Sequence, residues 1–334
     1  MKLTSNNMLG QQPLPSVQTS VDPLHPELEK AAKRLPGVSI KRWMLPVYRP
    51  MERSLSPFFI PKPDTRNVKI EHTHLGGRDV IVYSPTDRQP MGLMLYVHGG
   101  GLILGTHKNS IARCVPFVNE LGLVVVASSY RLAPQHPFPA ALNDTYGVWH
   151  WLNQNLHQFN LSQNKIAVSG ESAGGCIAAS LVNRVSEEGG PQPICQVLIY
   201  PMLDNDTALR SELDPLKFPL WNNHSNRTGW GSYLGNHHGR SALPRYSVPA
   251  KHQNLKALPP TWIGVGSADL FASENRVYAE RLTAAGVPCQ FEHLDGAFHG
   301  FDMVVPRAKP SRTFLSSQMN FLSEYLELET QQSI

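Results

Sequence analysis

The sequence of 334 residues has few cysteines, a low content of charged residues and no long apolar run. Each of these absences argues against a class of protein. Only four cysteines occur, without the spacing of a metal or redox site, so we expect buried free thiols at Cys114, Cys176, Cys195 and Cys289. Charged residues make up 17% of the chain, the net charge is only +4, and there is no tract of basic residues. A nucleic-acid-binding surface is therefore not expected.

Long apolar runs are also missing. No stretch approaches the roughly 20 apolar residues that cross a bilayer. Residues 1–15 contain one lysine but no apolar core of a secretory signal. The sequence therefore predicts a cytoplasmic location without stable membrane insertion. It also predicts no long exposed apolar segment that could dock on a lipid droplet, and no activation at a lipid interface.

Among the features that are present, residues 170–174 read G-E-S-A-G, a match to G-x-S-x-G. Residues 165–169 before them predict a strand, and residues 173–186 after them predict a helix rich in small side chains. This context is typical of the turn that holds a nucleophilic serine, here Ser172. A chance match in a loop is the alternative, and the strand–turn–helix context argues against it.

A second glycine motif, H-G-G-G, occupies residues 98–101 directly after a predicted strand at 93–97. Three successive glycines weaken a strand but let the backbone approach a ligand closely. Such a loop supplies backbone N–H groups that stabilise an oxyanion. The two motifs in this order indicate acyl transfer to water.

The N–H groups of Gly100 and Gly101, joined by that of Ala173, are the predicted oxyanion donors. Gly99 is a less suitable donor and is assigned a supporting part. His98 is expected to position the loop and not to act in catalysis.

A serine nucleophile needs a base and an acid that orients the base. Predicted strands at 260–265 and 289–294 are followed by loops that contain Asp269 and His299. Binding sites of parallel sheets gather at such loops, and the chain order Ser, acid, His fits the same class. We predict His299 as the base and Asp269 as the acid. The weaker candidates for the acid are Asp204, Glu274, Asp295 and Asp302.

Together these residues resemble the hormone-sensitive lipase family of α/β-hydrolases, which includes the bacterial type IV esterases. The resemblance covers roughly residues 65–326, and it is most specific in Y-R-L-A-P-Q-H-P-F-P-A at 130–140, predicted as a turn before a helix at 140–155. It implies an eight-stranded, mostly parallel sheet flanked by helices, with a helical cap. Members often form homodimers through the last strand, so a homodimer is possible.

Four positions depart from the family pattern. Glu171, a supporting residue before the nucleophile, stands where Asp is more frequent, and Ser129 stands where Asp often precedes Y-R-L-A-P. Ser273 replaces a carboxylate near the predicted acid, and Leu102 replaces a frequent aromatic. These departures bear on substrate preference and pH optimum, because no member of the predicted triad is lost.

Two segments fall outside the β/α alternation. Residues 1–60 and 205–255 are expected to form the cap, and residues 61–204 and 256–334 the catalytic core. In the first segment, residues 26–35 show helical spacing of apolar positions, while residues 1–15 are expected to be a disordered tail. In the second, the density of large apolar side chains predicts a lined pocket: Leu216, Phe218, Leu220, Trp221, Trp230 and Tyr233.

The sequence as a whole predicts a serine hydrolase that acts on short- to medium-chain acyl esters through a covalent acyl-enzyme. Neither a metal nor an organic cofactor is expected, and a small-molecule ester is the expected partner. Hydrolysis of amides or lactones by the same triad is an alternative. A non-catalytic small-molecule receptor on the same fold is a second alternative, and it is disfavoured because Ser172, Asp269 and His299 are all present.

Overall fold

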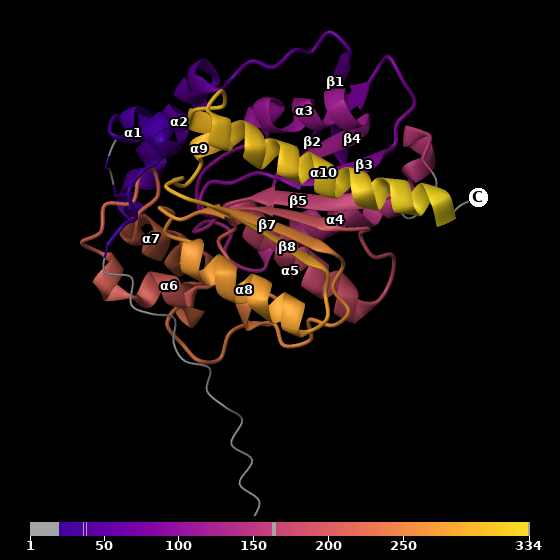
Figure 1. Cartoon of the computed structure of the whole chain (residues 1–334). Helices are drawn as coiled ribbons and strands as arrows, with labels where there is room; N and C mark the ends of the chain where they lie inside the picture. The colour runs from indigo at the N-terminus through magenta and orange to yellow at the C-terminus, as the bar shows by residue number, and fades with distance from the viewer. Residues whose placement is uncertain (1–19, 36, 38, 162–164, 333–334) are drawn as a thin grey trace, which may run out of the picture.

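The computed structural model describes residues 20–35, 37, 39–161 and 165–332, and its centre is an eight-stranded sheet (Figure 1). The strand order is β1-β2-β4-β3-β5-β6-β7-β8. Strands β1 and β2 pair antiparallel, β2 pairs antiparallel with β4, and the other pairs are parallel. The bounds are β1 Val68–Leu75, β2 Arg78–Pro85, β3 Gly92–Val97, β4 Leu123–Ser128, β5 Ile166–Glu171, β6 Gln196–Ile199, β7 Thr261–Gly266 and β8 Cys289–Leu294.

The central strands are buried along their whole length, and their sequences explain this. Strands β3 and β4 read GLMLYV and LVVVAS, without the polar alternation of a strand that faces water. Such continuous apolar runs are typical of parallel strands covered by helices on both faces. The predicted eight-stranded, mostly parallel sheet is thus confirmed. Strand β8 is an edge strand and is mostly half-buried.

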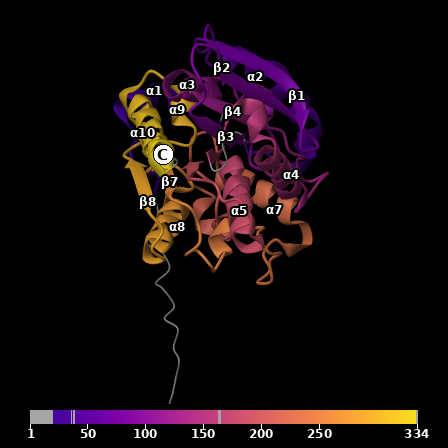
Figure 2. The same cartoon turned by 90° about the vertical axis from the view of Figure 1, so that its right-hand side faces the viewer.

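Helices cover both faces of the sheet (Figures 1 and 2). On one face lie α3 (Ile111–Leu121) and the long C-terminal α10 (Lys309–Gln332). On the other face lie α4 (Ala140–Gln154), α5 (Ala173–Glu188) and α8 (Ala272–Ala284). Two apolar clusters correspond to these two layers, so the sheet is buried between them. Short helical turns complete the core: η2 His107–Asn109, η3 Leu156–Phe159 and α9 Phe301–Val304.

The N-terminal part contains two helices, and the sequence predicted only the first. Helix α1 (Pro26–Ala32) is shorter than the predicted 26–35, and its wholly buried Leu28 packs in the core cluster beside α10. The N–H of His25 donates to the Gly296 carbonyl at 2.9 Å. The residue that caps α1 is therefore hydrogen-bonded to the loop before His299. Residues 1–15, the predicted tail, lie outside the described residues.

After the turn η1 (Arg42–Met44), α2 (Leu45–Phe59) carries the chain across the mouth of the site. Its outward residues include Trp43 just before it, Val47 and Phe58, with exposed fractions of 76%, 72% and 83%. The sequence did not single out these exposed apolar residues. The inner face of α2 is held by polar contacts, which leave its apolar residues facing solvent.

Residues 205–255 form short helices and loops: α6 Asp206–Leu209, η4 Ser211–Leu213, α7 Asn223–Leu234, η5 Gly235–His237 and η6 Pro249–Lys251. Of the large apolar side chains expected to line a pocket there, Leu220 and Trp221 do line the catalytic cavity. Trp230 and Tyr233 instead are fully buried in the core, because α7 turns that face inward. Phe218 is also a core residue, and Leu216 packs against the core.

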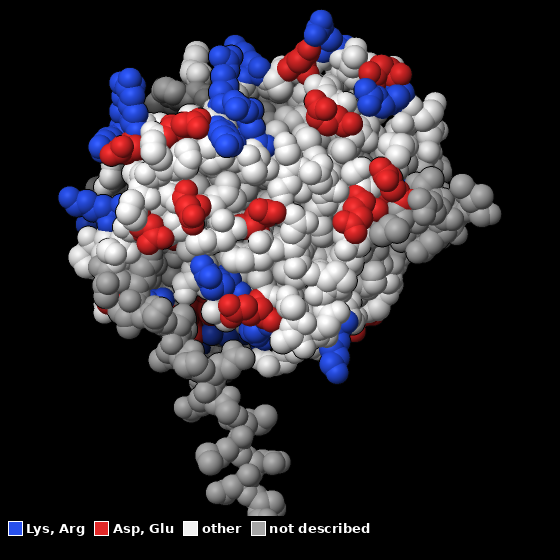
Figure 3. All heavy atoms as spheres, in the orientation of Figure 1, with Lys and Arg blue, Asp and Glu red and all other residues white. Residues whose placement is uncertain are grey.

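The surface view agrees with the modest net charge, because residues of both signs are interspersed over the face in Figure 3. The predicted free thiols are confirmed, three of them buried and Cys289 half-buried. Among the described helices, none has the length and apolarity needed to cross a membrane.

Candidate active site

Ser172 lies on the sharp turn between β5 and α5 that the G-x-S-x-G motif predicts. Its backbone has a φ of +53°, a conformation that costs a non-glycine residue about 1–3 kcal/mol and that only surrounding contacts can enforce. Its N–H donates to the Ile199 carbonyl at 2.9 Å, and its carbonyl accepts from the N–H of Met202 at 3.0 Å. The turn is thus held against the end of β6, with the side chain directed into the cavity.

Three predicted site residues are brought together by a chain of hydrogen bonds. The Ser172 Oγ lies 2.9 Å from His299 Nε2, and His299 Nδ1 lies 2.8 Å from Asp269 Oδ2. The other carboxylate oxygen of Asp269 accepts the N–H of Phe271 at 2.9 Å. Asp269 is 1% exposed, so its charge acts on the histidine with little screening by water. The loops after β7 and β8 supply the acid and the histidine.

The other candidate acids have different partners. Glu274 is buried and accepts the N–H groups of Leu203 at 2.6 Å and Asp204 at 3.2 Å, and burial together with Asp204 raises its pKa well above the ordinary value. Asp204 pairs with Lys251 at 3.2 Å. Asp295 is exposed, and its Oδ1 lies 3.9 Å from His293 Nδ1. None of these carboxylates contacts His299 in the described hydrogen bonds.

The H-G-G-G loop curls so that its N–H groups remain available. The Gly100 carbonyl accepts the N–H of Leu104 at 2.7 Å, and the φ of Gly100 is +121°. A Cβ on Gly101 would lie 2.1 Å from the Trp221 ring, so only glycine fits there. Among the described hydrogen bonds, none uses the N–H of Gly100, Gly101 or Ala173. Gly99 packs against Glu171 and the Ser172 Cβ.

His98 holds this loop and does not reach the nucleophile. Its Nδ1 lies 2.8 Å from the Gly99 carbonyl, and its ring stacks on Tyr130 with centroids 4.3 Å apart. The Tyr130 hydroxyl donates to the His98 carbonyl at 2.9 Å. The tyrosine of the Y-R-L-A-P segment therefore supports the oxyanion loop. The sequence predicted only a turn there, because the contact spans 32 residues.

Two neutral histidines near this loop make stability depend on pH. Burial lowers the pKa of His98 and of His107 to about 4, from an ordinary 6.5. Between pH 6.5 and 4 the unfolded chain binds these protons and the folded chain does not, so the free energy of unfolding falls by about 1.4 kcal/mol per pH unit for each group. Urea unfolding from pH 7 to 4.5 should show this loss.

The change His107→Gln removes one of these two groups, so the free energy of unfolding should fall with decreasing pH by about 1.4 kcal/mol per pH unit less than in the native chain. Equal slopes in the native chain and the His107→Gln variant would contradict the assignment.

A buried ionic network supports the nucleophile turn from α3. Arg113 donates to Asp302 at 2.5 Å, to Glu171 at 3.0 Å and to the Tyr200 hydroxyl at 2.7 Å. The Tyr200 ring lies edge-on to His299, with centroids 4.8 Å apart. Sequence reasoning missed Arg113 and Tyr200, although a lone arginine in the apolar segment 111–118 was a signal. Asp302, once a candidate acid, belongs to this network.

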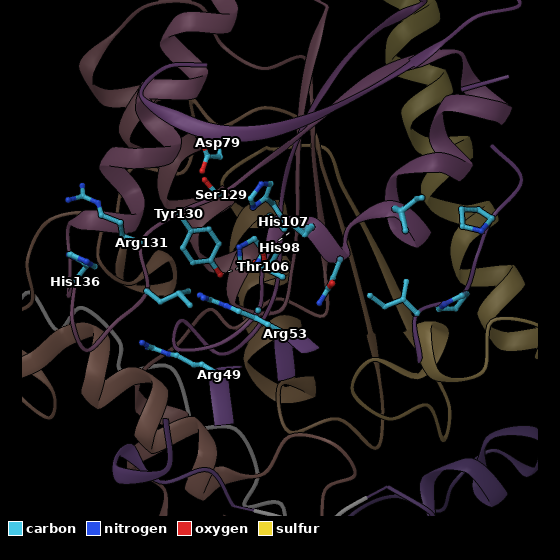
Figure 4. Close-up of a pocket in the computed structure, with 18 of the residues that line it drawn as sticks. Arg49, Arg53, Asp79, His98, Thr106, His107, Ser129, Tyr130, Arg131 and His136 are labelled. Atoms are coloured by element: carbon cyan, nitrogen blue, oxygen red, sulfur yellow. Dashed lines mark hydrogen bonds between the residues drawn. The ribbon is translucent and has the colours of Figure 1, made fainter. Parts of the chain in front are cut away.

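Ser172 and His299 line a cavity of about 370 Å³ between the core and α2. Tyr48 and Glu52 of α2 and Trp221 line it opposite the nucleophile. A larger cavity of about 960 Å³ lies on the other side of loop 98–106 and does not contain Ser172. Figure 4 shows Arg49 and Arg53 extending side by side into it. The smaller cavity is therefore the one that the hydrogen-bonded Ser172 and His299 line.

Comparison with known proteins agrees with this geometry. The model of a family described as having the alpha/beta hydrolase fold matches residues 94–303. Esterase LipI of Mycobacterium tuberculosis is 32% identical over 66% of this chain and 69% of its own length. Carboxylesterase NlhH from the same organism is 32% identical over 68% of this chain and 73% of its own length. A solved bacterial heroin esterase has a TM-score of 0.83 at 28% identity, covering 91% of this chain and 98% of the other.

The family match extends over more than half of the chain and includes Ser172, Asp269 and His299. The chain belongs to the α/β-hydrolase family, and within it to the carboxylesterases.

Proposed function

We propose that the chain hydrolyses short- to medium-chain carboxylic esters through a Ser172–His299–Asp269 triad and a covalent acyl-enzyme. The observation that carries the proposal is the unbroken hydrogen-bond chain from Asp269 through His299 to Ser172, at 2.8 and 2.9 Å. Esterase relatives that cover most of the chain support ester hydrolysis as the reaction.

In the first step, His299 Nε2 takes the proton of the Ser172 hydroxyl while Oγ attacks the ester carbonyl carbon. The free N–H groups of Gly100, Gly101 and Ala173 stabilise the negative charge that develops on the carbonyl oxygen. His299 then returns its proton to the leaving alcohol.

In the second step, His299 takes a proton from water, which attacks the acyl-enzyme, and the proton returns to Ser172 as the carboxylic acid leaves. Asp269 keeps the proton of the neutral imidazole on Nδ1 throughout and stabilises the imidazolium.

The cap completes this proposal. We assign residues 1–60 and 205–255 to it, of which residues 1–19 lie outside the described residues. Support comes from Tyr48 and Glu52 in the first segment and Leu220 and Trp221 in the second, because all four line the catalytic cavity.

The size of the catalytic cavity limits the acyl chain. At about 370 Å³ it is near the lower end of the roughly 300–1,000 Å³ of small-molecule pockets. Each methylene contributes about 0.8 kcal/mol only while the cavity buries it. We expect kcat/KM to be highest between about four and eight acyl carbons.

The measurement is a panel of p-nitrophenyl esters from acetyl to palmitoyl, with an anilide and a lactone included. A steady rise to the palmitoyl ester would contradict the proposed limit. Faster turnover of the anilide or the lactone would favour the alternative substrate classes, because the acyl-enzyme chemistry is shared.

A further inference from the structure

Helix α2 is amphipathic, and its apolar side faces outward. The side toward the protein body carries Leu45, Tyr48, Arg49, Glu52 and Ser56, of which only Leu45 is fully buried. The opposite side, which we call the outer stripe, consists of Trp43, Val47, Met51, Leu55 and Phe58, all exposed. A surface helix of a globular protein normally buries its apolar side, so this arrangement is reversed.

Polar contacts fix the reversed orientation. Arg49 donates to the carbonyls of Ile103, at 2.8 Å, and Ala133. Asn109 donates to the Ser56 hydroxyl at 2.7 Å and to the Glu52 carboxylate at 3.4 Å. Turning the outer stripe inward would break these bonds and leave polar groups of the core unpaired. The apolar side is therefore presented to solvent by the fold.

The exposed apolar residues are concentrated at one place. Of the nine strongly exposed large apolar side chains in the described chain, five form the outer stripe, and Leu220 and Val304 lie on the rim of the catalytic cavity that α2 also lines. Met91 and Leu209 are the remaining two. Exposed apolar residues that gather in this way mark an interaction surface, unlike scattered single ones.

Charge identifies the occupant of this surface. Between residues 39 and 63 the exposed charged side chains are Lys41, Arg42, Arg53 and Lys62, all positive. Arg53 and Lys62 line the larger cavity and the one acid, Glu52, lines the catalytic cavity, so Lys41 and Arg42, next to Trp43, are the charges that accompany the outer stripe. A second copy docked by a two-fold axis would set Lys41 and Arg42 near the same two cations of its partner. An anionic lipid surface instead attracts them, and tryptophan and phenylalanine suit the boundary between headgroups and acyl chains.

We propose that the outer stripe docks α2 on anionic lipid surfaces, with the mouth of the catalytic cavity facing the lipid. The helix lies in the plane of the interface and does not cross it, because only one side of it is apolar. Leu220 and Val304 then lie next to the lipid, so an ester dissolved there reaches the cavity without crossing bulk water.

The full chain is tested by flotation with vesicles of equal parts phosphatidylglycerol and phosphatidylcholine at low salt, without substrate. We expect binding that weakens with added salt and is at least tenfold weaker with phosphatidylcholine alone. Trp43 is the one tryptophan among six that is exposed, so its emission should shift to the blue on binding. The shift should be absent in Trp43→Phe.

Matched variants locate the surface. The double change Val47→Ser with Phe58→Ser should lower vesicle affinity at least tenfold and leave kcat/KM on a dissolved ester unchanged, since neither side chain lines the catalytic cavity. Met91→Ser with Leu209→Ser removes the two exposed apolar side chains that lie elsewhere, with exposed fractions of 41% and 46%, and should leave binding intact.

Three results would overturn the proposal. They are absence of vesicle binding at low salt, equal losses in the two double variants, and a concentration-dependent dimer that only the Val47 and Phe58 changes abolish. Because binding is measured without turnover, its failure is distinct from failure of the proposed ester hydrolysis.

Discussion

Replacing Ser172 by alanine should lower kcat on a p-nitrophenyl ester on the order of a million-fold, the loss seen when a triad serine is removed. The Oγ that forms the covalent bond is gone, and His299 and Asp269 are left without a nucleophile to activate. The fold should persist, because the turn is held by backbone bonds to Ile199 and Met202 that do not involve the hydroxyl. A stopped activity assay measures the loss of kcat, and circular dichroism on the same sample measures whether the fold persists.

The matched control is Ser273→Ala, a half-buried serine in the first turn of α8 with no described contact to the triad. It should keep activity within a few-fold of the native chain. If purified Ser172→Ala retained more than a few per cent of native activity, Ser172 would not be the nucleophile.

Much of the site could be predicted because several of its residues occur in short sequence motifs. A strained serine turn and a glycine loop require particular residues at fixed spacing, so Ser172, Gly100 and Gly101 stand out in the sequence. Asp269 and His299 could be predicted because they follow predicted strands of a parallel sheet. The sheet itself was predictable from the resemblance and from continuous apolar strands such as β3 and β4.

The residues that sequence reasoning missed act through long-range contacts. Tyr130 supports the oxyanion loop 32 residues before it, and Arg113 joins Glu171 to Asp302, 189 residues away. No local pattern contains these pairings. Helix α2 was missed for another reason: its apolar side faces solvent, so hydrophobic periodicity could not place it against a core.

The change Asp269→Asn should lower kcat about ten-thousand-fold near neutral pH, through the tautomer of His299. In the native chain the carboxylate accepts the Nδ1 proton, which leaves Nε2 free to accept the serine proton. Asp269 Oδ1 also accepts the N–H of Phe271, so the asparagine amide oxygen should keep that bond and present its NH₂ group to Nδ1. That group stabilises the tautomer with the proton on Nε2, which cannot act as base.

Glu274→Gln is the matched control for this prediction. Glu274 accepts the N–H groups of Leu203 and Asp204 through one oxygen, an arrangement that glutamine can reproduce, and burial raises the pKa of its carboxyl group. We expect kcat within about tenfold of the native value, by analogy with the modest cost of a neutral hydrogen bond. Both variants are assayed side by side with their melting temperatures. A larger loss in Glu274→Gln than in Asp269→Asn, at equal stability, would show that Asp269 is not the acid that orients His299.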